Sequence, residues 1–274
     1  MTSFLLFVLA PFFIAEPGPS AQQKTPEQDR AVAAIKKLGG TVEYDQKAPA
    51  RPVQSVDLEG TKISDVGLAV LKDLPQLREL SLRDTTISDV GLKNLNVLKN
   101  LCQVDLGRTR ITNAGLAHLQ GMTRMLDLHL GQTKITDAGL MYLKGMTELR
   151  ELHLGRTNVG DAGLAVLESL PQLERLHLTR TQVTDKGLVH LKDLKKLEML
   201  QLGYTRITNA GLVNLKNLTN LQELKLDGTA VTDEGLQYLK PLTNLQVLEI
   251  GETKITSAGA KELQNALPKV KIQR

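Results

Sequence analysis

Residues 149–172 read LRELHLGRTNVGDAGLAVLESLPQ, and this stretch sets the pattern for most of the chain. Its apolar, threonine and glycine positions return every 24 residues, nine times between Val53 and Pro268, without an insertion. The leading apolar residues of the units are Val53, Leu77, Leu101, Met125, Leu149, Leu173, Leu197, Leu221 and Leu245. A fixed period of this length predicts a solenoid, in which each unit buries its apolar side against its neighbours.

Within each unit the pattern changes from a strand to a helix. Alternation such as Leu152-His153-Leu154 predicts a strand with apolar side chains inward. Asp161 and its equivalents stand where a helix N-cap is expected. Gly163 and its equivalents cost about 1 kcal/mol each relative to alanine inside a first helical turn. Their recurrence therefore predicts that neighbouring coils approach too closely there for a side chain. The threonine before them, Thr157 in this unit, is expected to hydrogen-bond the turning backbone.

The consensus L-x-x-L-x-L-x-x-T-x-I-T-D-x-G-L-x-x-L-x-x-L-x-x resembles the leucine-rich-repeat family over about four fifths of the chain. The T-x-I-T-D-x-G-L segment is similar to a class found in bacterial leucine-rich-repeat proteins, and also to the repeats of F-box/leucine-rich-repeat proteins. The resemblance implies an α/β solenoid: a curved stack with a parallel sheet on the concave face and helices on the convex face. Family members use this fold to hold other proteins.

The chain outside the repeats (residues 53–268) divides into three segments. Residues 1–21 are expected to be a signal peptide, because the apolar run Phe4–Ala15 is too short for a membrane span and small, turn-prone residues follow it. An uncleaved interfacial anchor or a wrongly chosen start codon are the alternatives. Residues 22–52 are expected to form a linker and a helix-strand cap, and residues 269–274 a capping strand. The leader favours a secreted or periplasmic protein, with a cytoplasmic location as the alternative.

Composition excludes several classes of function. A net charge of +4 is too small for a typical nucleic-acid-binding protein. The single cysteine, Cys102, excludes an internal disulfide. The sequence contains no phosphate-binding loop and no recognisable set of nucleophile, acid and base. We therefore expect a monomeric protein that is not an enzyme, has no catalytic residues and no cofactor, and does not bind nucleic acid.

Function must then lie on positions that the repeat leaves free. The fifth position of the middle units carries His129, His153 and His177 on three successive strands. The eighth position of the middle units supplies the rest of the predicted partner-binding site, Arg108, Arg156, Arg180 and Tyr204. Arginine forms bidentate contacts with carboxylates, so the predicted partner is a protein with an acidic surface. The alternative is that these charges only solubilise an exposed sheet.

A metal site at the histidines is not expected from the sequence. His129 and His153 with Asp127 or Glu151 have suitable ligand chemistry. However, residues two apart on a strand lie nearly 7 Å from one another by strand geometry, which is long for a shared ion. The alternative is a row of neutral imidazoles whose mutual repulsion opposes protonation.

Two functions remain from the sequence. The first is a scaffold that binds a protein partner on its concave face. The second is a substrate-recognition adaptor similar to F-box/leucine-rich-repeat subunits of ubiquitin ligases. Against the second, the residues before the repeats are predicted to hold one helix and one strand rather than a three-helix F-box.

Overall fold

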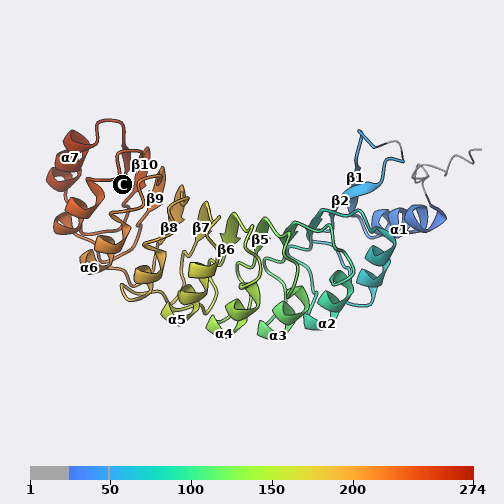
Figure 1. Ribbon diagram of the computed structural model, residues 1–274. Helices are drawn as coiled ribbons and strands as arrows, with labels where there is room; N and C mark the ends of the chain where they lie inside the picture. Colours follow the sequence, from blue (N-terminus) through green and yellow to red (C-terminus); the bar gives the residue numbers. More distant parts are fainter. Residues whose placement is uncertain (1–24, 49) are drawn as a thin grey trace, which may run out of the picture.

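The computed structural model describes residues 25–48 and 50–274, which form a curved solenoid with one continuous sheet on its concave side (Figure 1). The predicted signal peptide lies outside the described residues. The sheet has 11 strands in sequence order; β1 pairs antiparallel with β2 and every later pair is parallel. The predicted fold class is confirmed. The strands are β1 Thr41–Tyr44, β2 Val53–Asp57, β3 Glu79–Ser81, β4 Gln103–Asp105, β5 Asp127–His129, β6 Glu151–His153, β7 Arg175–His177, β8 Met199–Gln201, β9 Glu223–Lys225, β10 Val247–Glu249 and β11 Lys271–Gln273.

The register of the sheet follows the sequence period. His129 pairs with His153, and His153 with His177, so residues one period apart are direct neighbours. Any side chain repeated at the fifth position therefore forms a row across the concave face.

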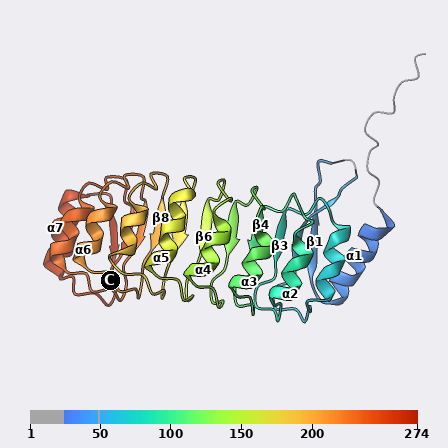
Figure 2. The same ribbon diagram turned by 60° about the horizontal axis from the view of Figure 1, so that its bottom comes forward.

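The convex side consists of short helices, seen in front of the sheet in Figure 2. Most inner units have one α turn that continues as a 3-10 helix, and three units have the 3-10 form alone. A 3-10 helix rises about 2.0 Å per residue against about 1.5 Å for an α-helix, so a short unit crosses the stack with fewer residues. The α-helices are α1 Pro26–Lys37, α2 Asp89–Leu92, α3 Asn113–Leu116, α4 Asp137–Leu140, α5 Asp161–Leu164, α6 Asn209–Leu212 and α7 Ser257–Ala266. The 3-10 helices are η1 Gly67–Asp73, η2 Lys93–Leu95, η3 Ala117–Leu119, η4 Met141–Leu143, η5 Ala165–Ser169, η6 Gly187–Leu191, η7 Val213–Leu215 and η8 Asp233–Leu239.

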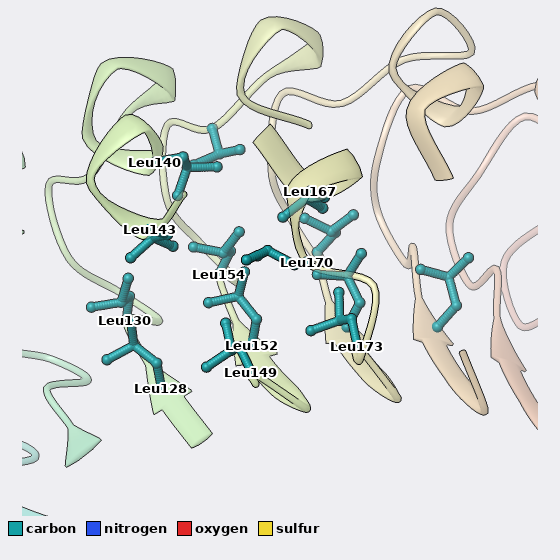
Figure 3. Close-up of a cluster of buried hydrophobic side chains, with 14 of the residues drawn as sticks. Leu128, Leu130, Leu140, Leu143, Leu149, Leu152, Leu154, Leu167, Leu170 and Leu173 are labelled. Carbon is teal, nitrogen blue, oxygen red and sulfur yellow. The ribbon is translucent and has the colours of Figure 1, made fainter. Parts of the chain in front are cut away.

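Leucines fill the space between sheet and helices. Figure 3 shows Leu128 and Leu152 on two neighbouring strands, and Leu143 and Leu167 on the helical side of the same core. All four are fully buried. Burying one such side chain stabilises the fold by about 1.5–3 kcal/mol, and each contacts the next unit, so the units support one another.

The recurring aspartates join one unit to the next, and the prediction that they are N-caps was wrong. The N-cap of α3 is Thr112, whose hydroxyl accepts from the Ala114 N–H at 3.3 Å. Asp89, from the preceding unit, accepts from the Thr112 N–H and from its hydroxyl, both at 2.7 Å. We call this set of inter-unit contacts the Asp–Thr ladder. Its pairs are Asp65–Ser88, Asp89–Thr112, Asn113–Thr136, Asp137–Gly160, Asp161–Thr184, Asp185–Thr208, Asn209–Thr232 and Asp233–Thr256.

The ladder explains the repeated glycine. A Cβ on Gly163 would lie 2.6 Å from the Oδ1 atom of Asp137 in the preceding unit, which is closer than real Cβ contacts. Gly67, in the first unit, has no preceding ladder carboxylate, and its nearest neighbour would be the Ile63 Cγ1 atom at 3.3 Å. The expected close approach is confirmed, and the obstructing group is the ladder side chain.

The threonine row bonds within its own unit. Thr157 is 4% exposed, and its hydroxyl donates to the Leu154 carbonyl at 2.6 Å. The predicted contact with the turning backbone is therefore present, and it satisfies a hydroxyl that would otherwise be buried without a partner.

The two ends of the stack differ from the inner units. At one end α1 and the antiparallel strand β1 lie beside β2, and Thr25 caps α1 by accepting from the Gln28 N–H at 3.2 Å. At the other end α7 and β11 follow the last repeat. Among residues 25–48 and 50–274, no helix has the length and apolar character needed to cross a membrane.

Candidate functional site

The three predicted histidines come together on the concave face. The ring centroids of His129 and His153 are 3.8 Å apart, and those of His153 and His177 are 3.6 Å apart. The side chains are 31%, 26% and 16% exposed in that order, so each ring keeps a solvent-facing edge while its faces are covered. Strand register holds the rings together, because the three residues occupy matching positions on β5, β6 and β7.

Glu151 lies at the meeting point of the rings. Its Oε1 atom is 2.5 Å from Nε2 of His153, 3.8 Å from Nε2 of His129 and 3.9 Å from Nε2 of His177. The Cα spacing along the strand predicted that carboxylate and imidazole would be too far apart to share an ion. That prediction was wrong, because the side-chain tips lean toward one another. We call His129, Glu151, His153 and His177 the histidine cluster.

Neighbouring charges orient the histidine cluster. The Oδ2 atom of Asp105 lies 3.3 Å from Nδ1 of His129, and its Oδ1 atom accepts from the Gly107 N–H at 2.7 Å. Arg83 contacts the same carboxylate at 3.7 Å. On the other side, an Arg175 guanidinium nitrogen lies 3.7 Å from Oε2 of Glu151. The sequence prediction assigned no role to these groups.

Burial favours the neutral form of His153 and His177. Desolvation lowers the pKa of His153 to about 4, and the neighbouring imidazoles add to this effect against the hydrogen bond with Glu151. Desolvation also lowers the pKa of His177. Burial alone raises the pKa of Glu151, but its hydrogen bond with His153 and the nearby charges outweigh burial and leave that pKa below its usual value. Near neutral pH His153 and His177 are therefore neutral beside the Glu151 carboxylate.

The predicted eighth-position residues line one rim of the sheet, just beyond the strand ends. Arg108, Arg156, Arg180 and Tyr204, which we call the arginine rim, are exposed and have φ angles of 56°, 58°, 58° and 55°. The Arg180 guanidinium lies 4.1 Å from the centre of the Tyr204 ring, whose hydroxyl donates to Glu252 at 2.8 Å. No ion pair to Arg108, Arg156 or Arg180 occurs within the described residues.

Every unit adopts the left-handed conformation at this eighth position. Gly60 and Gly228 occupy it in two units, with φ angles of 65° and 63°. These two glycines were the sequence signal for a left-handed turn, and the sequence analysis did not use it. The rim residues are therefore presented by a strained turn rather than by the strand itself.

Two further features of the concave face were missed. A hollow of about 250 Å³ over β2–β5 is lined by acidic side chains, among them Asp57, Glu79 and Asp127. At the opposite end, Lys225 lies 3.3 Å from Glu223 and 2.8 Å from Glu249. The carboxylates were visible in the sequence, but side-chain orientation decides which of them meet.

Comparison with known proteins agrees with the repeat architecture. A leucine-rich-repeat family model matches residues 74–95, 146–167, 170–192 and 217–240. No curated protein matches the chain in sequence.

Among solved structures, two internalins from Listeria monocytogenes are similar in fold. One is 19% identical with a TM-score of 0.56, and covers 93% of this chain and 98% of its own. The other, internalin C2, is 24% identical with a TM-score of 0.63, and covers 85% and 98% respectively. A leucine-rich-repeat protein from Leptospira interrogans is 19% identical with a TM-score of 0.54, and the match covers 75% of this chain and 62% of that protein. The four matched segments recur in the phase of the 24-residue period to within one residue, so the family model identifies leucine-rich repeats in these segments of the chain.

Proposed function

We propose that the protein is a non-enzymatic interaction scaffold that binds an acidic protein surface along the arginine rim and the neighbouring histidine cluster. The observation that carries the proposal is the exposure of Arg108, Arg156 and Arg180 without an ion-pair partner among the described residues. Elsewhere on the concave face, cations such as Arg83, Arg175 and Lys225 contact carboxylates of the chain itself.

The backbone at the rim supports the same conclusion. A left-handed conformation costs a non-glycine residue roughly 1–2 kcal/mol, and glycine adopts it without this penalty. Arginine or tyrosine nevertheless stands there in four of the middle units, at Arg108, Arg156, Arg180 and Tyr204. Residues whose backbone is strained, and whose side chains are of the kinds that dominate interfaces, are typical of binding surfaces.

The partner chemistry follows from the side chains. Guanidinium groups bind carboxylates through two parallel hydrogen bonds, and Tyr204 with Arg180 stacked on it supplies an aromatic contact. Such an interface depends on charge, so its affinity falls as ionic strength rises.

Charge reversal tests the location of the binding surface. In Arg156→Glu/Arg180→Glu we expect capture of partner proteins from the source cells to fall at least tenfold, measured by quantitative mass spectrometry of the bound fraction. The matched control is Lys144→Glu/Lys216→Glu, which makes the same change in net charge at exposed positions outside the concave face. Equal capture by the rim variant and the control would refute the proposed surface.

A secreted or periplasmic location is part of the proposal and is supported by the short apolar run Phe4–Ala15. Mass spectrometry of the mature N-terminus tests it: cleavage near Ala21 is expected, and an intact Met1 in the cytosol would contradict it. The comparisons give no support to the ubiquitin-ligase adaptor, and we do not propose it.

A further inference from the structure

The histidine cluster brings together nitrogen and oxygen atoms of the kinds that bind metal ions, and the proposed protein interface does not account for this arrangement. The Nε2 atoms of His129 and His153 and a carboxylate oxygen of Glu151 all lie within 4.8 Å of one another. Nε2 of His177 is 3.9 Å from the same oxygen. Three potential metal-binding atoms, from His129, Glu151 and His153, thus lie around one small volume on the concave side of β5 and β6, and His177 on β7 borders it.

The spacing fits a first-row transition metal. Zinc bonds of about 2.0–2.1 Å in a tetrahedral site place the ligand atoms about 3.3 Å from one another. The three distances from Glu151 Oε1 to imidazole Nε2 atoms are 2.5, 3.8 and 3.9 Å. Each of these distances from the carboxylate differs from the tetrahedral value by less than about 1 Å, and binding an ion would turn the stacked rings so that their nitrogens face it.

Neighbouring charged residues orient the possible ligands in the way that is usual around metal sites in proteins. A metal-bound histidine usually donates its second ring N–H to a carboxylate, which fixes the tautomer. Asp105 stands at that place, 3.3 Å from Nδ1 of His129, and is itself held by the Gly107 N–H. Arg175 contacts Oε2 of Glu151 and leaves Oε1 facing the rings.

One ring atom lacks a partner. Nε2 of His177 is buried and has no hydrogen-bond partner within the described part of the chain. A buried polar atom without a partner is uncommon in native proteins and calls for a ligand.

We infer that the histidine cluster binds one divalent transition-metal ion of the zinc class through His129, His153 and Glu151, with the Nε2 atom of His177 beside the open fourth position. The ion takes the place of the proton shared by His153 and Glu151. Two imidazoles and one carboxylate suit Zn²⁺, Cu²⁺ and Ni²⁺ and are poor ligands for Ca²⁺ or Mg²⁺, which prefer oxygen. The site joins β5 and β6, and it does not depend on the protein partner proposed above.

The test uses tag-free full-length protein, stripped with a chelator and titrated with Zn²⁺ in a calorimeter. We expect one ion per chain, bound at least tenfold more tightly than Ca²⁺ or Mg²⁺, and a raised melting temperature. With Co²⁺ in place of Zn²⁺ we expect the visible absorption bands of a tetrahedral site. Binding of no zinc, or of zinc no more tightly than calcium, would overturn the inference.

Variants locate the ion. Glu151→Gln and His153→Gln are expected to weaken binding at least tenfold, with circular dichroism showing that both remain folded. His190→Gln is the matched control, because His190 also contacts a carboxylate, Glu168 at 2.7 Å, but stands outside the histidine cluster. Asp105→Asn tests a positioning residue: we expect roughly 10–100-fold weaker binding with the Co²⁺ spectrum kept. Equal loss in His190→Gln, or no loss in Glu151→Gln, would place the zinc elsewhere and refute the site.

Discussion

The Asp–Thr ladder and the concave face use the same repeat for opposite purposes. In the ladder each pair repeats one interaction, a side-chain oxygen that accepts from a backbone N–H of the next unit, and in Asp89–Thr112 and Asp161–Thr184 the carboxylate also accepts from the hydroxyl. On the concave face equivalent positions carry different chemistry: His153 faces a carboxylate and two rings, while Lys225 three units further on is held by two glutamates.

This difference separates stability from recognition. A change in the ladder removes a contact that the next unit needs, so it is expected to affect folding of the stack. A change on the concave face leaves the leucine core and the ladder intact, so it is expected to affect binding. Within the concave face, Lys225 is paired with two glutamates, whereas Nε2 of His177 in the histidine cluster has no hydrogen-bond partner among the described residues.

The largest effect is expected where a side chain would collide with the ladder. Gly163→Ala places a Cβ 2.6 Å from the Asp137 carboxylate and should lower the free energy of unfolding by about 2 kcal/mol, in the range of overpacked cores. Gly67→Ala is the matched control, because no ladder carboxylate precedes it, and should be neutral or stabilising. Urea denaturation measures both, and equal destabilisation would show that the ladder is not the reason for the glycine.

A smaller loss is expected when a ladder acceptor is removed. Asp161→Ala leaves the Thr184 N–H and hydroxyl without their acceptor and should cost about 1–3 kcal/mol. Asp161→Asn should recover most of this loss, because Asn113 already accepts from the Thr136 N–H and donates its amide N–H to the Thr136 hydroxyl. If the asparagine variant is as unstable as the alanine variant in the same denaturation experiment, the ladder depends on charge rather than on hydrogen bonding.

Substitutions in the arginine rim are expected to weaken partner binding without lowering the stability of the fold. Arg156→Gly/Arg180→Gly relieves two left-handed residues and should leave the free energy of unfolding unchanged or raise it by about 0.5 kcal/mol per site. Partner capture should nevertheless fall. Gln132→Gly, at the same position with a φ angle of 59°, is the control that should keep full capture. If the double variant loses stability but still captures the partner, the rim arginines stabilise the fold and do not bind the partner.

The smallest effect is expected on the stability of the fold at acid pH, through the last pair of the Asp–Thr ladder, Asp233–Thr256. Hydrogen bonds from the Thr256 hydroxyl and N–H hold the pKa of Asp233 below its ordinary value of 3.8. A lowered folded-state pKa gives stability that is present above the unfolded-state value and lost as the pH falls through the folded-state value. Asp233→Asn should therefore show a weaker decline in unfolding midpoint between about pH 5 and pH 2. An identical decline in both proteins would contradict this contribution.

The sequence predicted the parts of the molecule that are set by periodicity. Leu152, Thr157 and Gly163 recur in phase, so their burial and their neighbours follow from stacking identical units. The hydrogen-bonding role of Asp161 was misassigned, because spacing alone does not distinguish a cap in its own unit from an acceptor for the next unit. The distance between Glu151 and the imidazoles was also wrong, because it depends on rotamers rather than on the pleat of the strand.

X-ray diffraction at the zinc absorption edge, from crystals of the full chain grown with Zn²⁺, would locate any bound ion and the three imidazoles in one experiment. We expect a single strong anomalous peak among His129, Glu151, His153 and His177 on strands β5–β7. Anomalous signal only outside this cluster, or none, would contradict the metal site. If the imidazoles of His129, His153 and His177 lay on separate surfaces, the strand register that forms the binding face would also be contradicted.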